Sequence, residues 1–366
     1  MKNKLASTVL LFGILATLCG QNQQADKSEL FDPSLNPVEN EYMDKQAEAL
    51  LFEVSSVLHN NQPAYPEPQA RRTALLLLDA VLHEVYAPHR VPVQEFFRTR
   101  ITRAIDEIES SEINEGMRIW KLYNHGFVIQ TKSTIFGFDL VRGKSVKVEQ
   151  FCIEDAEMNR LIELCDVLFI SHYHADHAEQ WVAQTFINQG KPVVAPPDIW
   201  EGKAIYKQIT HMEREAHREQ LLPIQDGQLN LKVVVYPGHQ GVDIINNNYL
   251  VTTPEGLSVA QMGDQSNDDD FKWIDEIGKH QDLDVLLPNC WTTDIVRVSR
   301  GFNPGLIITG HENELGHTID HREPYWLTYQ RQKGSDRFGG NNAVGYSQPL
   351  VLMTWGESYL YKRTNF

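Results

Sequence analysis

The sequence predicts a mixed α/β fold that is preceded by a region of helices. Between residues 41 and 110, apolar residues recur with the spacing of an α-helix. From Met117 onward, short apolar runs of strand length alternate with helical segments. The chain has 366 residues, of which 42% are hydrophobic, so it can form one large domain with a sizeable core and an appendage.

The first residues have the pattern of an export signal. Positive charge at Lys2 and Lys4 precedes a mostly apolar run from Leu5 to Cys19. This run is too short to cross a bilayer comfortably as a mature helix. We therefore interpret residues 1–20 as a signal peptide and expect an exported, periplasmic protein.

Cys19 adds the alternative of a lipid anchor. Cleavage before this cysteine would give a lipoprotein, although Leu18 is not the small residue that such signals usually carry. Ordinary cleavage near Gly20, or an uncleaved anchor, are the other interpretations. The polar residues 21–40 are expected to form a flexible linker.

Residues 41–115 are predicted to form a helical accessory region. The predicted apolar stripes are Ala47, Leu50, Leu51, Val54 and Leu58; then Leu75 to Leu78, Val81, Leu82 and Val85; then Phe97, Ile101, Ala104, Ile105 and Ile108. Such stripes must be buried. The helices are expected to pack on the catalytic domain, or to form part of a dimer interface in a homo-oligomer.

The remainder alternates between strand and helix patterns. After strands that begin at Met117, further strands are expected at 167–171, 193–194, 231–236, 249–253, 257–262, 285–287 and 349–361. Helices are expected at 179–187, 271–280 and 293–301.

Charge and cysteine content exclude several classes of function. The formal net charge of −16 argues against a nucleic-acid partner, which would require a basic patch, and leaves a small-molecule or lipid-like substrate. Outside the first 20 residues, no segment is long and apolar enough to cross a membrane. After Cys19 the cysteines are Cys152, Cys165 and Cys290, and three cysteines do not make a disulfide framework. Cys165 and Cys290 flank apolar runs and are expected to be buried.

The segment from Ser171 to His177 reads Ser-His-Tyr-His-Ala-Asp-His and directly follows an apolar run. Imidazole and carboxylate together suit zinc, iron or manganese. In an extended segment, His172 and His174 point to the same side, so they can share one ion. Asp176 and His177 follow as the chain turns and can face a second ion.

Later segments also place a histidine or an aspartate directly after an apolar run. His239 and His311 each follow an apolar run, and Asp264 follows Gly263 at the end of another; Asp139 closes an earlier strand. In this order the pattern resembles that of the metallo-β-lactamase superfamily of hydrolases over residues 116–366. The resemblance implies a four-layer αββα sandwich with the ligands on loops at one edge of two facing sheets.

The resemblance also implies a dinuclear site. Metal one would take His172, His174 and His239; metal two would take Asp176, His177 and His311, with Asp264 as the bridge. Zinc is favoured, with manganese or iron as alternatives. Two such cations lower the pKa of a bridging water, so that a hydroxide can attack an ester-like bond in a lactone, phosphodiester or phospholipid. Asp139 would orient a ligand loop.

Three residues are candidates for catalytic roles besides pure ligation: Asp176, His125 and His317. The segment around His125 resembles the branch with L-ascorbate-6-phosphate lactonase and N-acyl phosphatidylethanolamine phospholipase D, where it would touch the substrate or a ligand; a structural role is equally open. His317 is a candidate general acid or a loop-packing residue.

Two other functions stay open. The chain could be a non-catalytic exported metal-binding module that uses its helices for partners, or a mononuclear-iron dioxygenase on the same fold. True class B β-lactamases do not bridge with an Asp at the position of Asp264, and flavodiiron proteins carry Glu at the position of His174. The pattern therefore disfavours both of those classes.

Overall fold

The computed structural model describes residues 34–334, 345 and 348–363. The predicted signal peptide and Cys19 lie outside the described residues. Within them, no helix is both long and apolar enough to span a bilayer. Cys165 and Cys290 are buried, as expected.

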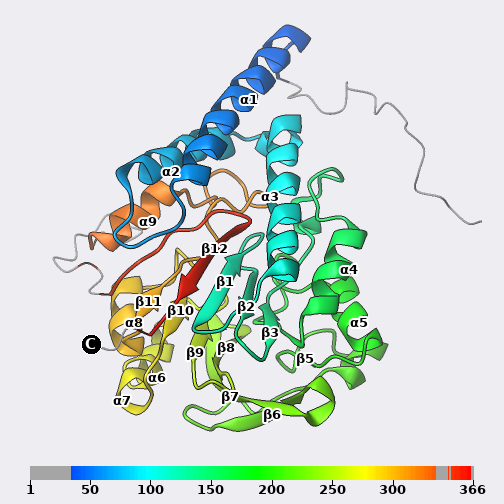
Figure 1. Cartoon of the computed structure of the whole chain (residues 1–366), viewed down its shortest axis with the longest axis vertical. Coiled ribbons are helices and arrows are strands. Elements are labelled where there is room, and N and C mark those ends of the chain that lie inside the picture. Colours follow the sequence, from blue (N-terminus) through cyan, green and yellow to red (C-terminus); the bar gives the residue numbers. More distant parts are fainter. Residues whose placement is uncertain (1–33, 335–344, 346–347, 364–366) are drawn as a thin grey trace, which may run out of the picture.

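Three helices precede the sheets: α1 (Pro37–Asn60), α2 (Gln69–Leu82) and α3 (Val91–Ser110). Helix α1 begins four residues before the expected start because Asn36 and Glu39 form a reciprocal capping box there. Its first half projects beyond the rest of the molecule, whereas α2 lies beside α9 and α3 runs along the first sheet (Figure 1).

One predicted stripe was partly wrong. Leu76 and Leu77 are partly exposed on α2, and Val85 lies beyond its last residue. The buried face of α2 instead includes the charged residues Arg71 and Asp79. Four consecutive residues cover most of the circumference of a helix, so Leu76 and Leu77 cannot share the buried face of Leu75 and Leu78.

Two six-stranded sheets follow. The first has the order β12-β1-β2-β3-β4-β5, and the second has the order β11-β10-β9-β8-β7-β6. The strands of the first sheet are β1 (Met117–Lys121), β2 (Phe127–Gln130), β3 (Ile135–Phe138), β4 (Val167–Phe169), β5 (Val193–Val194) and β12 (Glu357–Tyr361). Those of the second are β6 (Gln220–Ile224), β7 (Leu229–Gln240), β8 (Ile244–Thr252), β9 (Ser258–Gln261), β10 (Val285–Leu287) and β11 (Leu306–Ile307).

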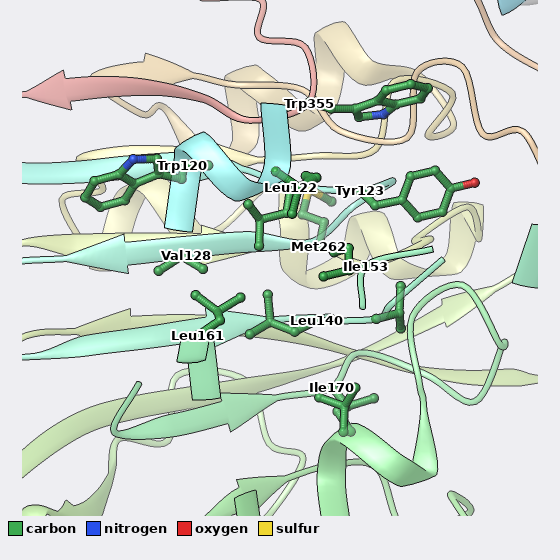
Figure 2. Packing of buried hydrophobic residues seen from close by; sticks show 14 of the residues in the cluster. Trp120, Leu122, Tyr123, Val128, Leu140, Ile153, Leu161, Ile170, Met262 and Trp355 are labelled. Atoms are coloured by element: carbon green, nitrogen blue, oxygen red, sulfur yellow. The ribbon is translucent and has the colours of Figure 1, made fainter. Parts of the chain in front are cut away.

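Successive side chains along a strand point to opposite faces of its sheet. One face packs between the two sheets, and the other packs under the helices. Ile119 of β1 points between the sheets, where it shares an apolar cluster with Val233 of β7. The next residue, Trp120, belongs to the outer cluster, which Figure 2 shows around Val128 and Leu161. This alternation gives the expected sandwich of two sheets covered by helices.

Helices complete the outer layers: α4 (Asp155–Leu164) and α5 (Gln180–Asn188) near the first sheet, and α6 (Phe271–Ile274), α7 (Ile277–His280) and α8 (Ile295–Phe302) near the second; α9 (Tyr325–Gln332) lies against α2 and α8. The single helix predicted over 271–280 is therefore two short ones. The strand predicted over 349–361 is limited to residues 357–361. The β7–β8 hairpin is longer than predicted, and His239 lies within β7.

Candidate metal centre

The predicted ligands gather where several strands end. His172 to His177 follow β4, Asp264 follows β9 and His311 follows β11. Strands β3, β4 and β5 run parallel to one another, as do β9, β10 and β11, so their carboxyl ends meet at one edge of each sheet. The fold therefore brings together residues that are far apart in sequence.

Asp264 lies between two groups of histidines. Its Oδ2 is 3.6 Å from Nε2 of His172, while its Oδ1 is 3.3 Å from Nε2 of His177 and 3.6 Å from Nε2 of His311. Asp176 faces the second group, with Oδ2 3.4 Å from Nε2 of His177 and 3.3 Å from Nε2 of His311. A carboxylate with one oxygen toward each group has the arrangement expected of a bridge.

His174 completes the first group. Donor atoms of His172, His174 and Asp264 all lie within 4.8 Å of one another. His239 is not part of such a group among the described residues. Its backbone N–H and Nδ1 are instead held by Asp270, at 2.8 and 3.0 Å. That contact leaves Nε2 of His239 available, which is the usual second contact of a metal-binding histidine. Its ligation stays a prediction.

Asp139 connects two of the ligand segments. Its carboxylate accepts hydrogen bonds from the backbone N–H and hydroxyl of Ser171, both at 2.7 Å, and contacts Nδ1 of His177 at 2.9 Å. Gln261 donates to the same carboxylate at 2.6 Å. Asp139 thus fixes the orientation of the His177 ring and leaves Nε2 pointing at Asp176 and Asp264, which fits the orienting role expected for it.

Two glycines allow the ligand loops to approach closely. Gly263 has φ 52°, and a Cβ there would lie 2.3 Å from Oδ1 of Asn246 and 2.5 Å from Cβ of Ser171. A Cβ on Gly310 would lie 2.1 Å from Cδ2 of His125. Only glycine fits directly before Asp264 and His311.

Burial and proximity strongly perturb the charges of the cluster. Burial, together with the neighbouring His177, holds the pKa of His172 well below its ordinary value. Burial also opposes charge on His177 and His311, but the Asp264 and Asp176 carboxylates outweigh it: the pKa of His177 is well above its ordinary value, and that of His311 rises to about 10. Burial alone would raise the pKa of Asp264, yet His177 and His311 hold it well below its usual range.

The donor set fits divalent metal ions. Nε2 of His172, Nε2 of His311 and Oδ1 of Asp264 are buried and make no hydrogen bond. Buried polar atoms are normally satisfied, so three unsatisfied nitrogen and oxygen atoms in one cluster need an explanation. Imidazole and carboxylate ligands suit zinc, manganese or iron.

The two additional histidines lie in different surroundings. His125 is fully buried behind His177, and its Nδ1 is 3.2 Å from Gln261; this position fits contact with a ligand residue better than contact with substrate. Burial, followed by the charge of His177, lowers the pKa of His125. His317 has its ring 5.2 Å from that of His311, and burial lowers its pKa.

A pocket of about 350 Å³ opens beside His311. It is lined by Gln240, Trp291, Gly316, His317, Thr318 and His321. The Trp291 ring stands edge-on to the His311 ring at 5.6 Å. The pocket therefore lies at the edge of the cluster, and His317 belongs to both.

Sequence reasoning missed several residues that hold the ligands. Asn124 donates to Oδ2 of Asp176 at 2.8 Å, Gln261 reaches Asp139, and Asp270 fixes His239. Asp270 could have been singled out, because it belongs to a run of three aspartates soon after Asp264. Asn124 is next to His125 in the sequence, but no local pattern predicts that it binds Asp176.

Comparisons with known proteins support the fold. No protein-family model matches the chain, and no curated protein matches it in sequence. Igni18, a metallo hydrolase from the hyperthermophilic archaeon Ignicoccus hospitalis, is 13% identical, and the match covers 68% of this chain and 99% of that one with a TM-score of 0.50. A possible metal-dependent hydrolase from Veillonella parvula is 14% identical over 67% of this chain and all (100%) of that one, with a TM-score of 0.49.

Another similar structure is CmlA, a diiron β-hydroxylase from Streptomyces venezuelae. It is 14% identical over 56% of this chain and 47% of that one, with a TM-score of 0.40. The comparison with Igni18 establishes the two-sheet fold, and the comparisons do not single out one branch of related hydrolases.

Proposed function

We propose that this chain, which has the fold of the metallo-β-lactamase superfamily, is a metal-dependent hydrolase that cleaves an ester-like bond. The observation that carries the proposal is the position of Asp264, whose two oxygens face two separate groups of histidines. A purely structural cluster would pair its buried polar atoms with one another, whereas Nε2 of His172 and Nε2 of His311 have no hydrogen-bond partner among the side chains around them.

The proposed ligands divide into two sets. His172, His174 and His239 would hold one ion, and Asp176, His177 and His311 would hold the other, with Asp264 shared. Bound there, divalent cations would lower the pKa of a coordinated water and polarise a carbonyl or phosphoryl oxygen. Asp139 and Asp270 would keep the rings of His177 and His239 in their ligating orientation.

The residues that line the pocket favour a substrate whose bound part is uncharged. None of its lining residues is Lys, Arg, Asp or Glu. A phosphodiester or phospholipid headgroup would find no Lys or Arg among these lining residues, although phosphate recognition usually relies on them. Trp291 offers an aromatic surface instead. We therefore place a neutral lactone or carboxylic ester ahead of the phosphorus esters.

His317 is the side chain placed to act on the leaving group. It lines the pocket, and a donor atom of its ring lies within 4.8 Å of donor atoms of Asp176 and His311. We assign it the hydrogen bond, or the proton, that the departing oxygen needs. Asp176 would act as a ligand whose carboxylate Asn124 holds in place.

One experiment separates this proposal from its alternatives. Elemental analysis of the purified protein should give close to two transition-metal ions per chain, and the same sample should hydrolyse a neutral lactone faster than a phosphodiester. Binding of at most one ion under metal-replete conditions would contradict the dinuclear site. Two bound ions without turnover of lactones, phosphodiesters or phospholipids would support a non-catalytic metal-binding module instead.

We also propose that the protein is exported, and this rests only on the sequence of residues 1–20. Mass spectrometry of the protein recovered from its native cells should show the loss of these residues. A lipid on Cys19 would establish the anchored form, and a mature chain that still begins at Met1 would contradict export through this signal.

A further inference from the structure

The loop that carries His311 and His317 has an unfavourable conformation of its own. His311 has φ 74° and Asn313 has φ 54°, so two non-glycine residues occupy the left-handed region. Glu312, Asn313 and Glu314 are buried, although all three are polar. Such a loop persists only where its surroundings hold it.

The first set of contacts that stabilises the loop comes from helix α2. Oδ1 of Asp79 accepts a hydrogen bond from the side-chain amide of Asn313 at 2.9 Å. The same carboxylate accepts the backbone N–H groups of Tyr325 and Trp326, both at 2.9 Å. Because these are the first residues of α9, Asp79 caps that helix from another part of the chain and joins it to the loop.

The second set of contacts comes from Arg322, whose buried guanidinium donates hydrogen bonds to the end of α2 and to the loop. Its Nη1 donates to the carbonyls of Leu82 and Glu84 at 2.7 and 2.9 Å. Its Nη2 donates to the carbonyls of Leu315 and His317, both at 3.2 Å. One guanidinium thus spans from the end of α2 to the backbone of His317.

We propose that α2, through Asp79 and the Arg322 bridge, positions His311 and His317 at the metal centre. Asp79 is then a positioning residue, and the helical region before the sheets is part of the site's scaffold although it supplies no ligand. For His311 the inference rests on the proposed metal site, but it can be tested without turnover because the affinity for metal is measured directly.

The test compares Asp79→Ala and Asp79→Asn with a matched control in the full-length protein. The control is Gln94→Ala: Gln94 is also buried in the helical region, but its side-chain amide donates to the carbonyl of Pro88, which lies outside the loop. Each variant is titrated with Zn²⁺ against a chelator, its zinc content is measured, and its stability is measured by urea unfolding without metal.

In Asp79→Ala we expect the affinity for the second zinc ion to fall by about 10- to 100-fold, as when residues that orient ligands are removed. Asp79→Asn retains one acceptor oxygen and should show a smaller loss. Gln94→Ala should lose stability but bind both ions with wild-type affinity. Two ions bound by Asp79→Ala with wild-type affinity would overturn the inference and leave the proposed function intact.

If Asp79→Ala does not fold, the decision falls to Asn313→Gly, which removes the same hydrogen bond from the loop side and suits the positive φ of this position. Wild-type affinity for both ions in that variant would overturn the inference. A wild-type protein that binds no second zinc ion would overturn the proposed dinuclear site, and the positioning of His311 as its ligand with it. A loss of affinity in Gln94→Ala equal to that in Asp79→Ala would show that general loosening, and not the hold on Asn313, explains the effect.

Discussion

The two main ligand segments, residues 172–177 and the loop around His311, reach the same site by different means. In the first, the backbone N–H groups of His177 and Ala178 donate to the carbonyl of His174 at 3.0 and 2.8 Å, so a local turn sets the spacing of the ligands. In the second, the contacts come from Asp79 and Lys121, 234 and 191 residues away from the residues that they hold.

The comparison teaches that ligand position is encoded both locally and at long range in this chain. The 172–177 segment depends on the strand before it, on its own turn and on contacts with Asp139 and Asn124, which are at most 52 residues away. The loop of His311 depends on buried charges: Lys121 binds Glu312, while Thr309 and Thr328 donate to the other oxygen of Glu312. The loop should therefore be the more sensitive of the two to distant substitutions.

The largest effect is expected from substitution of Asp264, which faces the histidines of both segments. Asp264→Asn keeps the shape of the side chain but removes its charge, so it cannot offset the repulsion between two dications. We expect hydrolysis to fall by more than about 100-fold, since the substitution of a residue that merely orients a ligand already costs 10- to 100-fold. The fold should persist by circular dichroism.

Asp243→Asn, an exposed site in the β7–β8 turn, is the control and should keep full activity. Near-normal hydrolysis by Asp264→Asn with both metals retained would mean that Asp264 only makes a turn.

A second substitution tests the long-range hold on the His311 loop. Lys121→Met leaves Glu312 buried without its cation, and both side chains are fully inaccessible. Removing one partner of a buried pair costs about 3–5 kcal/mol, so urea unfolding should show a loss of that size. Lys121→Met/Glu312→Gln should recover part of it, because the charge is gone and an acceptor for Thr309 remains.

The exposed pair of Lys45 and Glu48 provides the reference for this test: Lys45→Met should cost less than about 0.5 kcal/mol. Equal losses from the two single substitutions would contradict a special role for the buried pair.

The pH dependence of stability should report the burial of Asp79. Burial raises the pKa of this carboxyl from 3.8 to about 6, against the hydrogen bonds from Asn313 and the start of α9, and the charge of Glu312 adds to the rise. The folded state then binds the proton more tightly than the unfolded state. Stability from this group is therefore present below pH 3.8 and is lost as the pH rises to 6.

The difference corresponds to about 3 kcal/mol. In metal-free protein, the stability of Asp79→Asn relative to wild type should increase by up to this amount between pH 4 and pH 7. The same difference at every pH would show that Asp79 titrates normally.

The smallest effect is expected from histidines of the helical region. His59, His83 and His89 lie outside the cluster, and none belongs to a three-residue ligand group in the part of the chain that the structure describes. Their combined replacement by alanine should leave the zinc content unchanged and alter stability by about 1 kcal/mol or less. Loss of metal from the triple variant would assign the helices a direct ligand.

The sequence predicts the positions of most ligands, but it does not predict the residues that hold them. The strand ends before His172, Asp264 and His311 follow from apolar runs, since a residue after a parallel strand must lie at the sheet edge. The contacts of Asp270 with His239 and of Asp79 with Asn313 could not be predicted, because no periodicity links residues 31 or 234 positions apart.

The wrong part of the stripe on α2 has a different reason. Four consecutive residues, Leu75 to Leu78, cover most of the circumference of a helix, so Leu76 and Leu77 lie at the surface while Leu75 and Leu78 are buried. The burial of Arg71 and Asp79 on the same face could not be predicted, because each binds a partner more than 200 residues away.

The pairing of β12 with β1 constrains the order of events during synthesis. Strand β1 leaves the ribosome about 240 residues before its partner strand β12 is made, and Arg71 waits longer still for the carboxylate of Glu357. Until then, the nascent chain presents an open strand edge and a guanidinium whose buried partner does not yet exist. The first sheet and the helices above it can therefore be completed only after residues 357–361 have been made.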